Sequence, residues 1–210
     1  MFASSAGRAT GSVRPPVRSR GSRRALTQVA AGLALTGGAR RRRPAAGVEA
    51  DLRRSTDTPT TGPVLLVSTQ GGHLAQLLAL EAWYSAHDRL WVCPGTPDVM
   101  DRLAGERVVH SWSPTTRNLP NLLRNMVLAA RVVRRERPSL VVSAGAGVAV
   151  PFFVMAWAMR IPTAFIEVFD RVDSPTMTGR LCGPFSSARL VQWDSQLEFY
   201  PDARLMGPML

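Results

Sequence analysis

The chain has 210 residues and a net charge of +11, and all 26 of its basic residues are arginines. Twelve of these arginines but only three acidic residues fall in residues 1–60, so residues 61–210 carry a net charge of only +2. This near-neutral longer part does not favour a nucleic-acid-binding domain, and no apolar run reaches the about 18 residues that a membrane-spanning helix needs. Two cysteines, Cys93 and Cys182, do not make a disulfide framework or a thiolate metal site.

Residues 1–60 differ from the rest of the chain in composition. They are rich in Gly, Ala, Ser, Pro and Arg, and Phe2 is their only aromatic residue. Such a segment buries too little apolar surface to fold, so we expect a disordered, arginine-rich leader. A solvated leader, contact with an anionic lipid surface and contact with nucleic acid all stay open for it. Residues 61–210 are long enough for one domain with a core of its own.

The first folded elements are expected around a pair of glycines. An apolar, β-branched run at residues 64–68 predicts a strand, and residues 74–84 have the spacing of a helix. Gly71 and Gly72 form the turn between them, which lets a ligand approach the backbone and directs the first helical N–H groups toward a phosphate. The segment matches neither the P-loop nor the dinucleotide fingerprint, and a tight turn without a ligand is an equal alternative.

Strands and helices are expected to alternate through the remaining chain. The strands are predicted at residues 89–93, 107–110, 139–143, 163–168 and 189–192, and the helices at 97–103, 118–135 and 148–159. This order predicts an α/β fold, a Rossmann-like parallel sheet with helices on both faces. The nearly all-apolar helix at 148–159 is expected in the core, with docking on a membrane as the alternative.

A second glycine turn follows the predicted strand at 139–143. Gly145 and Gly147 lie in a run of small residues before the apolar helix. In a doubly wound sheet this strand lies beside the first one, so the two glycine turns flank one crevice. Close packing of a helix on the sheet also demands glycine and stays open as an explanation.

Four polar residues near the predicted crevice are candidates for chemistry. His73, in the first turn of a helix, could take a proton from a hydroxyl or donate to a phosphate, or could bond only to a neighbouring loop. Glu167 ends an apolar strand and could act as a base or orient a hydroxyl. Arg171 and Thr178 follow it and could hold a phosphate, although Glu167 and Arg171 could instead form a local ion pair.

Several segments, in their order along the chain, resemble a known family. It is the family of asparagine-linked glycosylation protein fourteen, the membrane-recruiting subunit of a two-part N-acetylglucosaminyltransferase, with bacterial counterparts in exopolysaccharide biosynthesis. The glycine turn also looks like the glycine loop of the peptidoglycan lipid-intermediate transferase. The matching segments are 69–74, 142–151, 166–172, 178–181, 191–194 and 200–201.

The resemblance implies that residues 61–210 are the acceptor-side, N-terminal half of a GT-B glycosyltransferase. A partner chain would then bind the UDP-sugar donor, and this chain would bind a polyprenyl-diphosphate-linked saccharide. By this analogy Gly71, Gly72 and His73 meet the acceptor, and Gly145 and Gly147 line the same cleft. The resemblance further implies that Glu167 and Arg171 face the partner.

These considerations define one leading function and one rival. The leading hypothesis is a glycosyltransferase subunit, inactive without its partner, that uses His73 and Glu167 in catalysis and Gly71, Gly72, Gly145, Gly147, Arg171 and Thr178 in acceptor binding. We expect no cofactor, and no bound metal because no DxD-like pair ends a strand. We expect no nucleic-acid partner, and a peripheral location on the cytoplasmic face of a membrane. The rival is a non-catalytic scaffold for the partner subunit.

Overall fold

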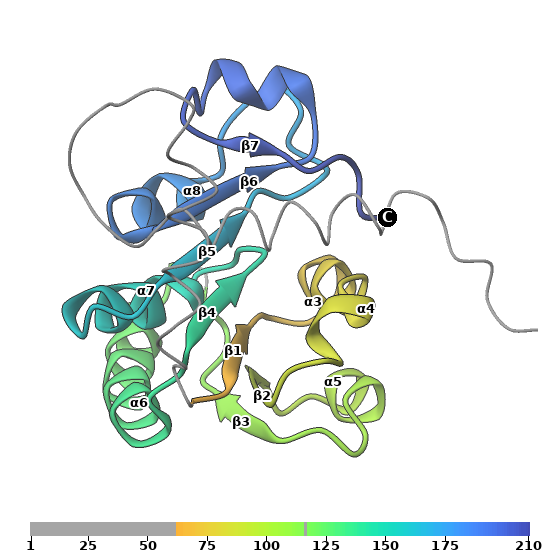
Figure 1. Cartoon of the computed structure of the whole chain (residues 1–210). Helices are drawn as coiled ribbons and strands as arrows, with labels where there is room; N and C mark the ends of the chain where they lie inside the picture. The colour runs from red at the N-terminus through yellow and green to blue at the C-terminus, as the bar shows by residue number, and fades with distance from the viewer. Residues whose placement is uncertain (1–61, 116) are drawn as a thin grey trace, which may run out of the picture.

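The computed structural model of the chain describes residues 62–115 and 117–210. The expectation of a disordered leader concerns residues 1–60 and therefore falls outside the described part. The described residues form one parallel sheet of seven strands with helices on both faces (Figure 1). The predicted Rossmann-like α/β fold is confirmed.

The strands of the described part are short, and the first six begin within one residue of their predicted positions. They are β1 Val64–Val67, β2 Arg89–Pro94, β3 Val108–Ser111, β4 Leu140–Ser143, β5 Thr163–Ile166, β6 Ala188–Val191 and β7 Arg204–Leu205. Only β7, a two-residue strand, was not predicted. The order across the sheet is β3-β2-β1-β4-β5-β6-β7, and every neighbouring pair is parallel. The chain therefore changes winding direction between β1 and β4, as a doubly wound sheet does.

The helices form two layers, one on each face of the sheet (Figure 1). One layer contains α3 Gly72–Leu78, α4 Glu81–Tyr84 and α5 Pro97–Arg102. The other contains α6 Leu119–Glu136, α7 Ala149–Ala158 and α8 Met177–Cys182. Successive side chains along a strand point to opposite faces of the sheet, so each strand contributes to an apolar core on either face. In β1, Leu66 faces the first helical layer, and Leu65 and Val67 face the second. Two short 3₁₀ helices, η2 Gly183–Phe185 and η3 Asp194–Glu198, complete the elements of the described part.

The helix predicted at 74–84 is in fact two helices. α3 ends at Leu78, and α4 begins at Glu81 after a turn in which the Leu80 N–H donates to the Leu77 carbonyl at 3.0 Å. In a continuous helix Leu74 and Trp83 would point in opposite directions, because nine residues make two and a half turns. The break lets both side chains enter the core, where both are buried.

The apolar helix α7 is a core element, which was the expected outcome. Phe152 and Phe153 are fully buried between the sheet and the neighbouring helices, and only Trp157 of its aromatic residues is well exposed. Packing in the core, rather than docking on a membrane, therefore accounts for most of its apolar side chains. Among the described residues no helix is both long and apolar enough to span a membrane.

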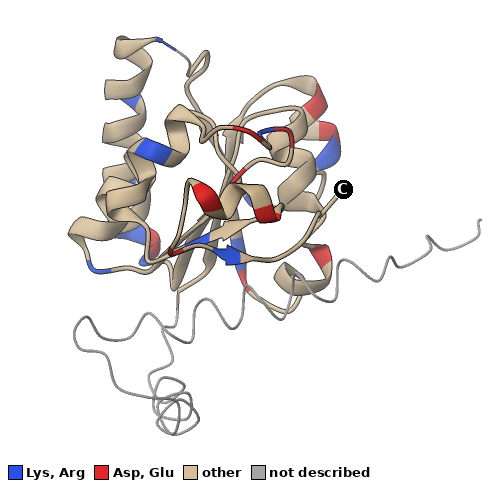
Figure 2. Cartoon of the chain, turned by 90° about the horizontal axis from the view of Figure 1, so that it is seen from above, with Lys and Arg blue, Asp and Glu red and all other residues tan. Residues whose placement is uncertain are grey.

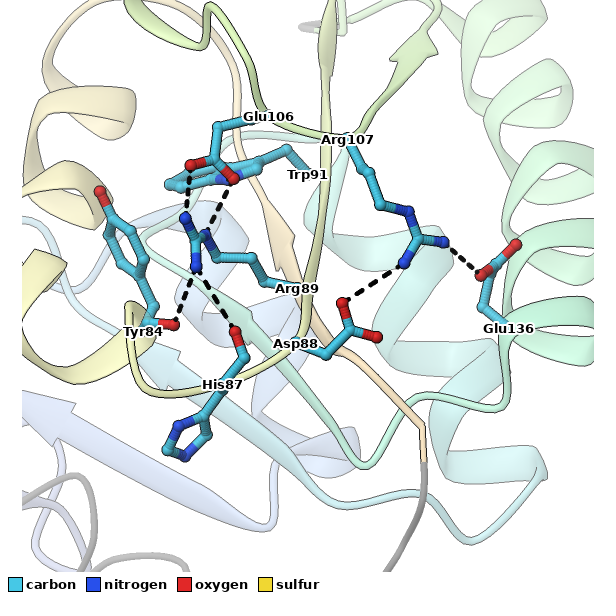
Figure 3. Close-up of polar contacts among 8 residues, drawn as sticks. All are labelled: Tyr84, His87, Asp88, Arg89, Trp91, Glu106, Arg107 and Glu136. Atoms are coloured by element: carbon cyan, nitrogen blue, oxygen red, sulfur yellow. Dashed lines mark hydrogen bonds and ion pairs between the residues drawn. The ribbon is translucent and has the colours of Figure 1, made fainter.

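An ion-pair network joins the amino ends of β2 and β3 to the end of α6 (Figure 3). Arg89 makes two bonds to the Glu106 carboxylate, at 2.6 and 2.8 Å, and the Arg89 guanidinium lowers the pKa of that carboxyl. Arg107 bridges Asp88 and Glu136, at 3.4 and 3.0 Å. The network fixes the edge of the sheet that lies opposite the cleft described next.

Candidate active site

A cleft of about 550 Å³ opens at the carboxyl ends of the strands. Its walls come from the loops after β1, β3, β4 and β5 and from the last residue of β2, with the β1 and β4 loops meeting at the point where the winding reverses. This is where open α/β sheets bind their ligands. The lining residues are Thr69, Gln70, His73, Pro94, Ser113, Pro114, Thr115, Gly145, Ala146, Gly147, Val168, Asp170, Arg171, Thr176 and Thr178.

Most of the residues predicted for the site line this one cleft. His73, Gly145, Gly147, Arg171 and Thr178 belong to the lining. The prediction that the two glycine turns flank one crevice is therefore confirmed in geometry.

The first glycine turn lies at the edge of the cleft. Gly71 and Gly72 are exposed between two lining residues, Gln70 and His73, but are not lining residues themselves. Gly71 has φ = 73° and ψ = −136°, a backbone conformation that side chains with a Cβ rarely adopt. The backbone therefore requires glycine at this position whether or not a ligand binds.

His73 bridges the two glycine turns. Its Nδ1 lies 3.0 Å from the carbonyl oxygen of Ala144, and because a carbonyl only accepts, Nδ1 carries the hydrogen of this bond. In the neutral ring Nε2 is then left as an acceptor, the state that a general base needs. His73 therefore makes the bond to a neighbouring loop that the sequence allowed and also lines the cleft; its role toward a hydroxyl or a phosphate stays a prediction.

The second glycine turn is shaped around this histidine. Gly145 has φ = 112°, and a Cβ placed on it would lie 3.2 Å from two atoms of the His73 ring. The buried Ser143 hydroxyl accepts the Gly145 N–H at 3.1 Å and so fixes the turn. A Cβ on Gly147 would lie 2.7 Å from the carbonyl oxygen of Thr115, so this glycine admits the loop after β3. Packing thus accounts for these glycines, and the same packing forms the cleft wall.

The loop after β5 places charged groups at the opposite wall. Arg171 is exposed, and its guanidinium has no ion-pair partner among residues 62–115 and 117–210. The local ion pair with Glu167 that the sequence allowed is therefore not formed. Gln196 holds the loop by donating from Nε2 to the carbonyl oxygens of Val168 and Arg171, at 3.0 and 2.9 Å. The loop thus offers a cation and the Asp170 carboxylate to the cleft.

Glu167 lies beneath the cleft rather than in its lining. Its side chain is fully buried, and its carboxylate accepts from the Val168 N–H at 3.2 Å, the Thr176 hydroxyl at 2.8 Å and the Tyr200 hydroxyl at 2.5 Å. Burial and the bond to Glu167 raise the pKa of Tyr200. Thr176 also accepts from the Gly179 N–H at 2.9 Å, which caps α8. Glu167 therefore anchors the loop that carries Arg171.

A chain of buried glutamines joins the first glycine turn to the end of the sheet. Gln192 donates from Nε2 to the Gln76 side chain at 2.7 Å and to the Glu167 carbonyl at 2.9 Å. Its Oε1 accepts the Met209 N–H at 3.1 Å. Sequence analysis missed these glutamines, because nothing in an isolated glutamine distinguishes a buried position from an exposed one.

Several lining residues were also missed. The rule that ligands bind at the carboxyl ends of parallel strands could have found Pro94 and Asp170, which follow predicted strands. No such signal exists for residues 113–115, since their place depends on how the loop after β3 packs. No group of three or more His, Cys, Asp or Glu side chains that could hold a metal ion occurs in the described part of the chain.

Known proteins resemble this chain in sequence and in fold. A family model described as "Oligosaccharide biosynthesis protein Alg14 like" matches residues 104–209. The human protein "UDP-N-acetylglucosamine transferase subunit ALG14" is 28% identical over 106 residues, which are 48% of this chain and 48% of the human one. The chain therefore aligns with about half the length of this curated relative.

Solved structures share the fold at low sequence identity. The crystal structure of Acinetobacter baumannii MurG matches with a TM-score of 0.52 at 16% identity, over 63% of this chain and 42% of that one. A UDP-N-acetylglucosamine 2-epimerase from Rickettsia bellii matches with a TM-score of 0.56 at 12% identity, over 70% and 44% of the two chains. These likenesses identify the Rossmann-like half of a GT-B architecture. Because the family model covers half of the sequence, this chain belongs to the Alg14-like family of oligosaccharide biosynthesis proteins.

Proposed function

We propose that this chain is the acceptor-binding subunit of a two-component glycosyltransferase. The complex would transfer N-acetylglucosamine or a related sugar from a UDP donor, held by a partner subunit, to a polyprenyl-diphosphate-linked saccharide. Membership of the Alg14-like family supports this reading, as does the name of the human relative, a UDP-N-acetylglucosamine transferase subunit. The single structural observation that carries it is the His73 ring at the winding reversal, with Nε2 left to accept a proton.

In this proposal the cleft residues have separate roles in binding and activating the acceptor. His73 removes the proton from the acceptor hydroxyl as that oxygen attacks the anomeric carbon, and the sugar–phosphate bond of the donor breaks. Arg171, which has no ion-pair partner among the described residues, holds the diphosphate of the acceptor together with the Thr178 hydroxyl of the same lining. Glu167 supports the Arg171 loop from below and takes no direct part, which replaces the catalytic role given to it from sequence.

The outer surface of α6 supports a peripheral membrane location. Leu119, Leu123 and Val127 are 65%, 60% and 51% exposed and follow one another at four-residue intervals, so they form one apolar stripe. Arg131 and Arg135 are exposed farther along the helix. Figure 2 shows basic residues as blue bands on the helices at the left of that view. An exposed apolar stripe beside cations suits the surface of an anionic lipid bilayer. We propose that this stripe, rather than the buried helix α7, faces the membrane that holds the acceptor.

Kinetics of the reconstituted pair test the catalytic proposal. His73→Ala should reduce turnover by at least about 100-fold, the contribution expected of a general base, while leaving the unfolding midpoint nearly unchanged. Asp170→Asn is the matched control, because this residue brings a titratable side chain to the same lining without a part in the proposed proton transfer, so its replacement should cost far less. Full turnover by the His73 variant would remove His73 from the mechanism and would favour the scaffold reading.

Vesicle binding tests the membrane proposal separately. The wild-type chain should co-sediment with vesicles that contain phosphatidylglycerol and much less with pure phosphatidylcholine. Leu123→Glu should abolish this binding, and Met100→Glu, a change at another exposed apolar residue on α5, should not. Equal binding by both variants would refute a membrane role for α6.

A further inference from the structure

The short segment after β3 is held in place by buried side chains of α6. The Asn125 side chain is 1% exposed, and its Oδ1 accepts the Trp112 N–H while its Nδ2 donates to the Trp112 carbonyl, both at 2.9 Å. Asn121, also buried, donates from Nδ2 to the Pro114 carbonyl at 3.0 Å. A buried amide that gives both its polar atoms to one residue fixes the backbone of that residue firmly. The backbone at Trp112 is therefore rigid.

The indole of Trp112 is held at the surface instead of in the core. It is 51% exposed, and the guanidinium carbon of Arg124 lies 5.0 Å from its ring centroid. Arg124 is itself fixed, because Nη1 donates to the Asn121 Oδ1 at 3.1 Å. The cation covers part of the indole, and the exposed half of the ring meets water. A large apolar side chain that is fixed and solvent-exposed is characteristic of a preorganised contact for a ligand.

Trp112 stands at the rim of the cleft. The next three residues, 113–115, all line it, and the carbonyl of Thr115 lies against Gly147 in the second glycine turn. The apolar stripe of α6 begins only a few residues farther along the chain, at Leu119. Trp112 thus directly precedes the cleft residues 113–115 in the chain, and its indole contacts α6 through Arg124.

We propose that Trp112 is a stacking platform for a pyranose ring of the acceptor. The face of an indole carries negative charge density, and one face of a pyranose presents a row of slightly positive C–H groups that packs on it. The remaining N–H donors of Arg124, beside the ring, can reach the sugar hydroxyls. The choice of a sugar as ligand rests on the proposed function, in which the acceptor is a saccharide.

Binding of N,N′-diacetylchitobiose to the full chain tests this site without the partner. Saturation-transfer NMR should detect binding by the wild type at millimolar concentrations of the disaccharide. Trp112→Ala should weaken it about tenfold, as expected for the loss of one aromatic contact, and Trp112→Phe should restore most of the affinity. Trp157→Ala is the matched control, because Trp157 is 58% exposed on α7, packs on Phe185 and lies outside the cleft lining.

Three results would overturn the proposal. One is no detectable binding by the wild type, and another is equal binding by the wild type and Trp112→Ala. The third is strong quenching of Trp112 fluorescence by brominated lipid in phosphatidylglycerol vesicles without any response to the disaccharide, which would make this residue a lipid contact. Failure of the proposed function is distinguishable, because an inactive pair that still bound the sugar through Trp112 would leave the site intact.

Discussion

Replacement of Glu167 by alanine should destabilise the fold strongly. The change removes the common acceptor of three hydrogen bonds and leaves the Tyr200 hydroxyl, the Thr176 hydroxyl and the Val168 N–H facing a cavity. A buried donor left without a partner costs about 1–3 kcal/mol, and the hydroxyls can partly reorient, so the sum is about 4 kcal/mol. Such a loss is a large part of the roughly 5–15 kcal/mol that stabilises a typical domain.

Glu167→Gln separates the anchoring role from a catalytic one. The amide keeps one oxygen for Thr176 and Val168 and turns its NH₂ group toward Tyr200, whose oxygen can accept. We expect a loss of about 1 kcal/mol, with turnover of the reconstituted pair close to that of the wild type. A catalytic carboxylate would give the opposite pattern, a stable fold with little activity.

Urea unfolding followed by far-UV circular dichroism measures the free energies directly. We expect the urea midpoint of Glu167→Ala to lie far below that of Glu167→Gln. The slope of the unfolding free energy against urea concentration should be the same for both variants. Tyr200→Phe removes one of the three donors, so its effect should be largely absent in the Glu167→Ala background. Equal midpoints for the alanine variant and the wild type would refute the anchoring role.

Three further outcomes can be measured on the isolated chain. Gly145→Ala should lower the free energy of unfolding by about 2 kcal/mol, because alanine is strained at φ = 112°. The added Cβ would lie 3.2 Å from the His73 ring and should displace it, which ¹H–¹⁵N spectra of the imidazole can detect. Burial raises the pKa values of Cys93 and Cys182 to about 12, so neither thiol should react with Ellman's reagent at pH 8 until urea unfolds the chain. The lowered pKa of Glu106 means that its pairing stabilises the fold at pH values above the normal carboxyl pKa, and that this stabilisation is lost as pH falls through the lowered pKa. Glu106→Gln should remove it, so the unfolding midpoint of this variant should change less with acid pH than that of the wild type.

The local pattern of apolar and polar residues was sufficient to predict the architecture of the sheet. Apolar runs of four to six residues, separated by helical periodicity and glycine turns, predicted six of the seven strands and their parallel pairing. The neighbouring positions of β1 and β4 followed from the winding rule, so the joint cleft of His73, Gly145 and Gly147 was predictable. The very short β7 was missed because two residues do not establish a period.

Side-chain direction was decided by contacts that are distant in the sequence. A carboxylate after an apolar strand indicated an accessible base at Glu167, but Tyr200, 33 residues later, closes over it. The break at Leu80 likewise exists because Trp83 must reach the same core as Leu74.

The amino-acid sequence by itself thus determined the order of elements and the edge of the sheet where the cleft lies. These properties depend on short-range periodicity and on the handedness of parallel connections. Only the tertiary structure decided which polar groups face the cleft, with Asp170 and Arg171 in the lining and Glu167 beneath it. Burial of a polar side chain is stable only when its partners are in place, and those partners come from segments that folding alone brings together.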